Sequence, residues 1–570
     1  LILLGIGLGV FALGIRFYSH FLADKIYRLD PAFKTPAHEF NDGVDYVPTN
    51  RHILFGHHFT SVAGAAPIVG PAIAMIWGWL PAFLWVVIGT VFAAGVHDFG
   101  ALVVSVRHKG KSLGTLARDI IGKRARTLFM LIIFFLILMV NAVFALVIAR
   151  LFIAYPGSVL PVLLAIPLAI LVGILIYRTR SGALIPSLSA LILLYVFVYL
   201  GQFYPITVNP LAETLGLTPL IFWILAIFIY TYFASSLPVW LLLQPRDYIN
   251  AHQLLVGLAI IFLGVMILHP VLVAPAFNHL ASESGAPSFI PFLFVTIACG
   301  AISGFHSLVA SGTSSKQLDK ETDARYVGYI GAVGEGSLAL TSILATAAGF
   351  ASYAAWSSHY SSWKAATTGG IQAYVDGVAH FATGVGIPAG VGVIFASVVV
   401  ISFAATSLDT SMRLQRYIIA ELGEDWKMPV LQNKWVASFI AVALCITLAL
   451  SKDGGKGGLL LWPLFGATNQ LLAGLALLVV TLWLWKQKRN FLPALIPMVF
   501  LLLMTGAAML LNVKHYFLQG DWFLVSLSGV IFTIVCWLIL ESFQAVRIFK
   551  NGRRTLNPAT ARNPSTGSGS

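Results

Sequence analysis

Long apolar runs follow one another along almost the whole of this 570-residue chain. A helix needs roughly 20 mostly apolar residues to cross the hydrocarbon core of a bilayer, which is about 30 Å thick. Stretches of this kind recur about fifteen times, and a water-soluble protein of this length has no interior large enough to bury them all. The sequence therefore predicts an all-α polytopic membrane protein, embedded in a lipid bilayer, with no soluble catalytic domain.

Lysine and arginine are concentrated in alternate connections between the predicted spans. The connection 107–126 alone carries seven of them and a single acid, Asp119. Cytoplasmic loops of membrane proteins are enriched in Lys and Arg, so these connections should be cytoplasmic, and the net charge of +13 gives no reason to expect a nucleic-acid partner. The N-terminus should then lie outside and the C-terminus inside. The predicted spans are 1–18, 54–78, 79–106, 126–154, 157–176, 184–205, 218–244, 253–275, 288–315, 328–353, 387–410, 435–451, 461–485, 491–512 and 521–545.

The predicted span 54–78 contains residues that interrupt a helix. Pro67 removes one backbone donor and clashes with the carbonyl four residues earlier, and the neighbouring glycines let the backbone unwind. A broken helix at mid-membrane frees carbonyl groups for cations and N–H groups for anions, which is how secondary transporters build their binding sites. The alternative is a simple proline kink with close glycine packing. We expect a substrate carboxylate at the N-terminal end of a half-helix that starts near Gly70, and substrate contacts from Gly64, Ala65, Ala66, Pro67 and Gly70.

The predicted span 218–244 repeats this theme with Ser235, Ser236 and Pro238. It should run in the opposite direction to the span 54–78. Two interrupted spans of opposite direction, five spans apart, are typical of an inverted five-helix repeat, and this places both serines among the substrate candidates. Taken alone, the motif is more typical of a kink.

A third group of small polar residues lies in the predicted span 288–315. Ala310, Thr313 and Ser314 put a backbone carbonyl and two hydroxyl groups on one helical face, and such hard oxygen ligands suit Na⁺. Small residues also serve helix packing, which is the alternative interpretation.

Ionisable residues inside membrane spans are costly, and they therefore indicate function. His57, His58, Asp98 and Glu335 are our candidates for proton coupling, and His306 is a candidate for both proton and substrate binding. Two others have simpler interpretations. Asp409 closes a span and should be a satisfied helix-end group, whereas Arg150 should snorkel to the outer surface.

Several longer strings resemble the carbon starvation protein (CstA) family, and the resemblance covers about residues 1 to 545. The matching strings are Asn41-Asp-Gly-Val-Asp-Tyr-Val-Pro-Thr-Asn50, Leu54-Phe-Gly-His-His58, Ala63-Gly-Ala-Ala-Pro-Ile-Val-Gly-Pro71, Leu237-Pro-Val-Trp-Leu-Leu-Leu-Gln-Pro-Arg-Asp-Tyr248, Ser303-Gly-Phe-His306, Ser311-Gly-Thr-Ser-Ser-Lys-Gln317, Thr406-Ser-Leu-Asp-Thr410 and Leu461-Trp-Pro-Leu-Phe-Gly-Ala-Thr-Asn-Gln470.

The resemblance implies uptake of peptides, or of pyruvate, across the inner membrane of a bacterium that lacks its preferred carbon source. It also implies the leucine-transporter fold of the amino-acid/polyamine/organocation superfamily. On that scheme a sodium site would join the carbonyls around Gly64 and Pro67 to Ala310, Thr313 and Ser314. The parts would be an extra span 1–18, a cytoplasmic loop 19–53, repeat one 54–205, repeat two 218–410, extra spans 435–545 and a cytoplasmic tail 546–570.

The sequence thus predicts a non-enzymatic, ion-coupled secondary transporter, driven by H⁺ or Na⁺, with no cofactor beyond a candidate Na⁺. One alternative is a membrane-embedded metal enzyme that uses His57, His58 and Asp98. Adjacent helical residues point about 100° apart, so the two histidines would chelate one ion poorly. The other alternative is a nutrient sensor. The sequence does not determine the oligomeric state.

Overall fold

The computed structural model describes residues 1–43, 45–179, 182–238, 240–451 and 461–555. Within these ranges the regular secondary structure is helical, apart from an isolated β-bridge between Thr49 and Leu318. Twelve described helices are long and apolar enough to cross a membrane, and the bent pair α4 (Arg51–Val62) and α5 (Ala66–Ala74) brings the number to thirteen. The predicted count of about fifteen adds two further segments: α24 (Lys434–Ala449), which is shorter, and residues 289–317, which form a chain of short helices.

The first half of the chain begins with one continuous helical run, Ile2–Tyr27, which contains α1 (Ile2–Leu13) and α2 (Ser19–Phe21). The helices that follow are α3 (Pro36–Glu39), α4, α5, α6 (Trp79–Gly89), α7 (Gly95–Arg107), α8 (Leu113–Ile120), α9 (Lys123–Ala154), α10 (Val159–Thr179), α11 (Leu184–Gly201), α12 (Asn209–Thr214), α13 (Pro219–Ser236) and α14 (Leu243–Leu268).

The second half opens with the short helices α15 (Phe289–Thr296), α16 (Ala298–Ala301), α17 (Gly304–Val309) and α18 (Ser315–Gln317), with a π-helical turn Ala310–Ser314 between the last two. The remaining helices are α19 (Ile330–Ala348), α20 (Tyr353–His359), α21 (Trp363–Gly384), α22 (Ala389–Asp425), α23 (Pro429–Gln432), α24, α26 (Trp462–Lys486), α27 (Leu492–Leu518) and α28 (Trp522–Thr555).

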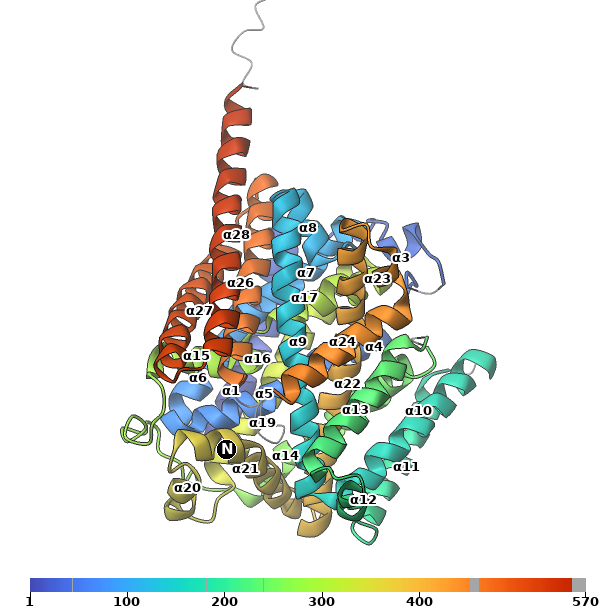
Figure 1. The fold of residues 1–570 in the computed structure, drawn as a ribbon, viewed down its shortest axis with the longest axis vertical. Coiled ribbons are helices and arrows are strands. Elements are labelled where there is room, and N and C mark those ends of the chain that lie inside the picture. Colours follow the sequence, from blue (N-terminus) through green and yellow to red (C-terminus); the bar gives the residue numbers. More distant parts are fainter. Residues whose placement is uncertain (44, 180–181, 239, 452–460, 556–570) are drawn as a thin grey trace, which may run out of the picture.

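The bundle has two ends of different charge. One end carries α3, α8 and α23 together with the Lys/Arg-rich connections, and we call it the basic end; the opposite end carries α12, α20 and α21 (Figure 1). Ion pairs join separate connections at the basic end, such as Arg107 with Glu321 at 2.5 Å and Arg126 with Asp425 at 2.9 Å. Charged residues from separate parts of the chain are thus tied together at this end.

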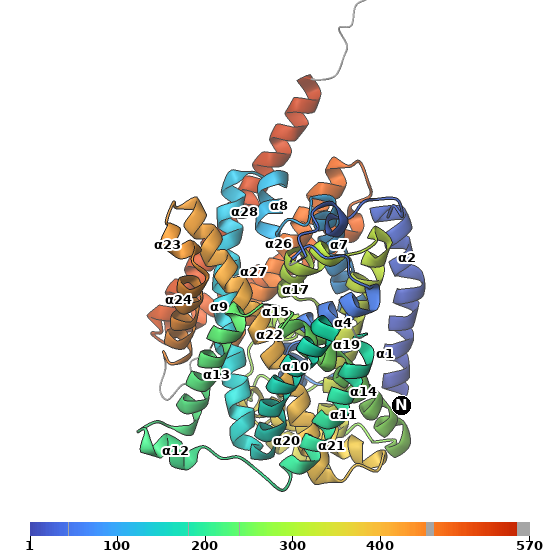
Figure 2. The same cartoon turned by 90° about the vertical axis from the view of Figure 1, so that its right-hand side faces the viewer.

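The centre of the bundle is built from long, fully packed helices, and its margins expose apolar side chains. α9 packs along α22, while α13 and α24 each contact both of them. The run Ile2–Tyr27, the hairpin α10–α11 and the pair α27–α28 lie at the margins, as the two views show (Figure 2). Their outward residues, including Ile2, Ile185 and Leu503, are exposed although strongly apolar, which suits a lipid environment. The chain is a multi-pass membrane protein.

Several predicted boundaries were wrong. The first span continues to Tyr27, so the predicted loop 19–53 begins as helix. The segment 354–386, predicted as a polar connection, holds α20 and the 22-residue α21, and α28 continues through the start of the predicted tail to Thr555. Residues 556–570 lie outside the described part.

Two further helix boundaries differ between the prediction and the structure. In both places buried charged side chains lower the hydropathy of the sequence, so the prediction ends the span too early or starts it too late. α14 begins at Leu243 and contains Arg246, which we had placed in a cytoplasmic loop. α22 continues from the predicted end at residue 410 to Asp425 and contains the buried Arg413.

Candidate substrate and proton site

The first interrupted helix is broken where the sequence predicts. α4 ends at Val62, α5 begins at Ala66, and the two axes differ by 46°. Ala63 leaves the helical conformation with φ −77° and ψ 67°. Pro67 stands in the first turn of α5, where its missing N–H is not needed.

The half-helix does not begin near Gly70, as we had expected. Gly70 lies one turn inside α5, and a Cβ at that position would come within 2.4 Å of the Thr296 carbonyl oxygen. Gly70 therefore allows two backbones to approach closely, and the free N–H groups of this half-helix belong to its first turn near Ala66.

The second interrupted helix lies at residues 289–317, and the prediction that it lies at 218–244 was wrong. Ile302 and Ser303 are extended, with φ −168° and −125°, between α16 and α17. This segment runs antiparallel to the first interrupted helix, since Thr49 pairs with Leu318 at one end while Gly70 lies against Thr296 towards the other. The signal in the sequence was the run of small residues Cys299-Gly-Ala-Ile-Ser-Gly304.

The motif at 233–238 instead ends a helix. α13 stops at Ser236, two residues before Pro238. The Ser235 and Ser236 hydroxyl groups lie 3.3 and 3.2 Å from the Ser438 hydroxyl of α24. The structure therefore puts both serines in a helix–helix contact and brings neither of them to a break.

A small cavity lies between the two breaks. Its volume is about 20 Å³, enough for one water molecule. Gly64 is essential to its shape, because a Cβ there would come within 2.8 Å of the Ser407 hydroxyl and 3.0 Å of the Phe144 ring. The cavity is lined by Val62, Gly64, Ala66, Pro67, Val140, Phe144, Cys299, Ser303, Phe305, Ser407, Phe465 and Asn469.

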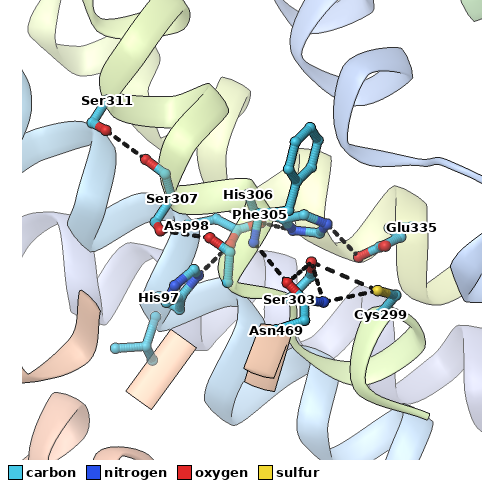
Figure 3. Close-up of polar contacts among 12 residues, drawn as sticks. His97, Asp98, Cys299, Ser303, Phe305, His306, Ser307, Ser311, Glu335 and Asn469 are labelled. Atoms are coloured by element: carbon cyan, nitrogen blue, oxygen red, sulfur yellow. Dashed lines mark hydrogen bonds and ion pairs between the residues drawn. The ribbon is translucent and has the colours of Figure 1, made fainter. Parts of the chain in front are cut away.

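Beside this cavity, one histidine stands between two buried carboxylates (Figure 3). His306 Nδ1 lies 2.7 Å from Asp98 Oδ2, and His306 Nε2 lies 3.1 Å from Glu335 Oε2. His97 Nδ1 lies 2.6 Å from the other oxygen of Asp98. The four side chains come from α7, α17 and α19, and at most 2% of any of them is exposed. We call them the His306 cluster.

Asn469 of α26 holds the second break in place next to the His306 cluster (Figure 3). Its amide oxygen accepts a hydrogen bond of 3.0 Å from the Phe305 N–H, which the second break leaves without a helical partner. Its amide nitrogen lies 3.0 Å from the Ser303 hydroxyl and 2.9 Å from Cys299 Sγ. We had not named Asn469 as a site residue; the available signal was an Asn in an apolar span.

The two adjacent histidines of α4 face different partners. His57 Nδ1 lies 2.8 Å from Asp247 of α14, and His58 Nδ1 lies 2.8 Å from the Ser314 hydroxyl. Both histidines are buried on the basic-end side of the first break. They act on separate neighbours, which does not fit a shared metal ion.

Asp409 is a buried mid-helix residue of α22, so its interpretation as a helix-end group was wrong. One of its oxygens lies 2.6 Å from the Arg246 guanidinium and accepts a hydrogen bond of 2.8 Å from the Tyr230 hydroxyl. This ion pair fixes α14 to α22.

The sodium candidates do not gather at the first break. The Thr313 hydroxyl donates to the Val309 carbonyl within its own helix, and Ser314 is bonded to His58. The hydroxyl that does reach the first break belongs to Ser407 of α22, which lies 3.4 Å from the Ser61 carbonyl oxygen.

Comparison with known proteins identifies the family of this chain. The family described as "Carbon starvation protein CstA" matches residues 1–359 and 354–508. The chain belongs to the carbon starvation protein CstA family. It is 33% identical over 548 residues to the peptide transporter CstA of Campylobacter jejuni, covering 87% of this chain and 78% of that one.

Two other relatives match the chain to a similar extent. The peptide transporter CstA of Bacillus subtilis is 32% identical, with 90% of both chains covered. The pyruvate/proton symporter BtsT of Escherichia coli is also 32% identical, with 88% of this chain and 80% of that one covered. Since the relatives are transporters, this member of the CstA family is a membrane transporter. Among solved structures, a manganese transporter from Eremococcus coleocola aligns with 88% of this chain and 99% of its own, at 12% identity and a TM-score of 0.49.

Proposed function

We propose that this CstA-family protein is a proton-coupled secondary transporter that imports a small carboxylate, pyruvate or a short peptide, across a bacterial inner membrane during carbon starvation. The observation that carries the proposal is the His306 cluster, which lies buried beside the cavity between two interrupted helices. The names of the relatives support the choice of cargo, and a proton symporter among them supports the choice of ion.

The His306 cluster suits one proton per transport cycle. With His306 protonated, two carboxylates face one positive imidazolium, because His97 adds no charge when neutral. The cluster then carries one net negative charge in a buried site, which is unfavourable. One further proton on Glu335 or Asp98 makes the cluster neutral. The coupled cluster therefore exchanges one proton as the site opens to one side of the membrane and then to the other.

The cargo carboxylate binds at the first turn of α5. The Ile68 and Val69 N–H groups donate to the Ala65 carbonyl and Pro67 has no N–H, so the donors of this turn are those of Ala65 and Ala66; the positive end of the helix dipole favours an anion there. The present cavity of about 20 Å³ is smaller than any candidate cargo, so the helices around it must move before a cargo can bind. Transport requires the helices around the cavity to separate at one end of the bundle and then at the other.

Packing supports a division into two inverted repeats that differs from the predicted 54–205 and 218–410. α14 packs on α4 and α22, and α26 packs in the same way on α17 and α9. α13 and α24 also occupy equivalent places, since each of them contacts both α9 and α22. The hairpin α10–α11 is then an insertion in the first repeat, and α20–α21 is an insertion in the second. Repeat one comprises α4/α5, α6/α7, α9, α13 and α14; repeat two comprises α15–α18, α19, α22, α24 and α26.

The basic end faces the cytoplasm in this proposal, as the positive-inside rule requires. The C-terminal helix α28 projects from that end (Figure 1). Protons and cargo therefore enter from the opposite end and leave at the basic end.

The test is uptake by purified protein in liposomes, with labelled pyruvate and labelled dialanine measured separately. An inward pH gradient, an inward sodium gradient and no gradient are compared at zero membrane potential. We expect accumulation of at least one cargo with the pH gradient alone. Accumulation driven only by sodium would refute proton coupling, and no accumulation of either cargo under any gradient would refute the proposed function.

A further inference from the structure

A second, larger cavity opens at the opposite end of the bundle. Its volume is about 380 Å³, which lies in the usual range of roughly 300–1,000 Å³ for small-molecule sites. It is formed by the last turns of α9, the start of α13 and the first half of α21. We call it the outer cavity, and its lining residues are Val147, Arg150, Leu151, Ile153, Ala154, Leu220, Thr367, Thr368, Ile371 and Gln372.

The outer cavity holds one cation without a protein partner. Arg150 is half-buried, and among the described residues it makes no hydrogen bond, ion pair or ring contact. The sequence predicts that Arg150 snorkels to the surface, and the structure shows in addition that it lines a hollow. A guanidinium offers five donors in a fixed fork that matches a carboxylate, so an unpaired one in a cavity is suited to bind an anion.

Of the other polar lining residues, Gln372 adds a donor for an anion, whereas the two threonines do not. The Thr367 and Thr368 hydroxyl groups donate to carbonyls of their own helix, at Trp363 and Lys364. The Gln372 amide is exposed at the rim, and its N–H₂ is available as a second donor. The remaining walls are mainly aliphatic, which suits a methyl group or a small apolar side chain next to the carboxylate.

The same face of α9 leads from the outer cavity to the central one. Val140 and Phe144 line the central cavity, whereas Val147 and Leu151 line the outer cavity. These positions follow at intervals of four, three and four residues, so they share one face of the helix. Arg150 stands six residues beyond Phe144, which is about 9 Å along the helix axis. A ligand released from Arg150 is thus about two turns from the central cavity.

We propose that the outer cavity is a receiving site, where Arg150 and Gln372 bind the carboxylate of the cargo before it enters the central cavity. This inference rests on the proposed function for the identity of the ligand and the direction of entry. The receiving site accepts pyruvate or the C-terminal carboxylate of a short peptide. It raises the local concentration of the anion and takes no part in proton coupling.

The test compares wild type with Arg150→Gln, Arg150→Lys and Lys364→Gln. Lys364 provides a matched control, because it is an exposed cation at the start of α21 that does not line the outer cavity. Pyruvate uptake into liposomes should show KM raised about tenfold by Arg150→Gln, with the maximal rate changed less than twofold. Arg150→Lys should fall between wild type and Arg150→Gln, and Lys364→Gln should match wild type. Unchanged KM in Arg150→Gln would overturn the receiving site while leaving the proposed function intact.

Direct binding separates the two proposals. Saturation-transfer NMR of the pyruvate methyl group on purified protein should give a signal that Arg150→Gln reduces severalfold and Lys364→Gln does not. If wild type binds pyruvate through Arg150 but transports nothing under any gradient, the carboxylate site at Arg150 stands, and the proposed function fails together with the role of that site in receiving cargo. A binding signal that is indifferent to Arg150 refutes the receiving site.

A phospholipid phosphate could offer the same charge to Arg150, so the lipid is varied as well. KM is compared in pure phosphatidylcholine and in vesicles containing phosphatidylglycerol. A carboxylate site gives the same Arg150→Gln effect on KM in both. If Arg150→Gln alters only the stabilisation by phosphatidylglycerol and leaves KM unchanged, the outer cavity holds a headgroup and the proposal is wrong.

Discussion

Replacement of Glu335 by Gln should separate cargo movement from the proton gradient. Glu335 is buried on α19, and its only described ion pair is the contact of 3.1 Å with His306, a geometry short of a hydrogen bond. Gln has nearly the same shape and no charge. In Glu335→Gln the cluster is already neutral with His306 protonated, and it no longer needs the additional proton.

The expected magnitude follows from counting that proton. If one proton accompanies each cargo molecule, a gradient of one pH unit supplies about 1.4 kcal/mol, which corresponds to about tenfold accumulation at equilibrium. Glu335→Gln should lose all of this and equilibrate at a ratio near one. It should still exchange labelled for unlabelled cargo, because the cavity and the breaks are unchanged.

The assay is accumulation of labelled cargo in liposomes with one pH unit imposed at zero membrane potential, followed by a separate exchange assay. Glu213→Gln is the matched control, since Glu213 is exposed on α12 at the opposite end. Tenfold accumulation by Glu335→Gln would show that Glu335 is not the coupling group. Loss of both accumulation and exchange would assign it a structural role instead.

Three further substitutions test the packing of the site. Gly64→Ala places a methyl group in the central cavity against Ser407 and Phe144, and this overpacking, which costs about 1–3 kcal/mol, should lower uptake tenfold or more. Gly506→Ala is the control: its methyl group meets nothing within 4 Å, so uptake should be unchanged. Asn469→Ala leaves the Phe305 N–H unpaired, at a cost of about 1–3 kcal/mol, so the Tm of the purified protein should fall by several degrees. Asn512→Ala is the control and should lower the Tm less, because the Asn512 side-chain nitrogen has no hydrogen-bond partner among the described residues. Equal Tm values for the two variants would contradict the role of Asn469 in pairing the Phe305 N–H. Arg246→Gln leaves the buried Asp409 carboxylate without its cationic partner, at a cost of about 3–5 kcal/mol, and should lower the Tm. The double variant Arg246→Gln with Asp409→Asn should recover much of the lost Tm. A double variant no more stable than Arg246→Gln would argue against the ion pair.

Local chemistry explains what could be predicted. Pro67 and Gly64 break a helix through their own backbone properties, so the first break was predictable from a short string. Buried ionisable residues are equally visible in an apolar sequence. For that reason Asp98, His306 and Glu335 were all candidates before their contacts were known.

Long-range packing explains what could not be predicted. The second break contains no proline. Gly304, next to it, lets α17 approach α26, because a Cβ there would come within 2.3 Å of the Asn469 backbone carbonyl oxygen. Conversely, Pro238 looked like a break and merely follows the end of α13. Arg246 looked like a loop residue because its partner, Asp409, is 163 positions away. The hydrophobic periodicity of a sequence gives no information about contacts between residues this far apart in the chain.

The polar contacts around the two breaks are distributed unevenly, and this asymmetry gives the proposed coupling of proton and cargo a direction across the membrane. On the basic-end side, α4 is held to α14 by His57 and Asp247, and α17 is held to α7 by His306 and Asp98. His58 and Ser314 join these two half-helices directly.

On the other side of the breaks, α5 has no charged side chain. The Ser342 and Tyr360 hydroxyl groups donate to its Ile68 and Ala72 carbonyls, and Gly70 lies against Thr296. Opening towards the basic end therefore disturbs histidine–carboxylate pairs, whereas opening towards the opposite end leaves them intact. Under the proposed proton coupling, and with the basic end in the cytoplasm, a proton acquired from outside is held until the inner half-helices separate. Thermodynamic linkage makes this coupling reciprocal: a bound proton strengthens cargo binding by the same factor by which bound cargo strengthens proton binding. Both ligands then leave together when those pairs part.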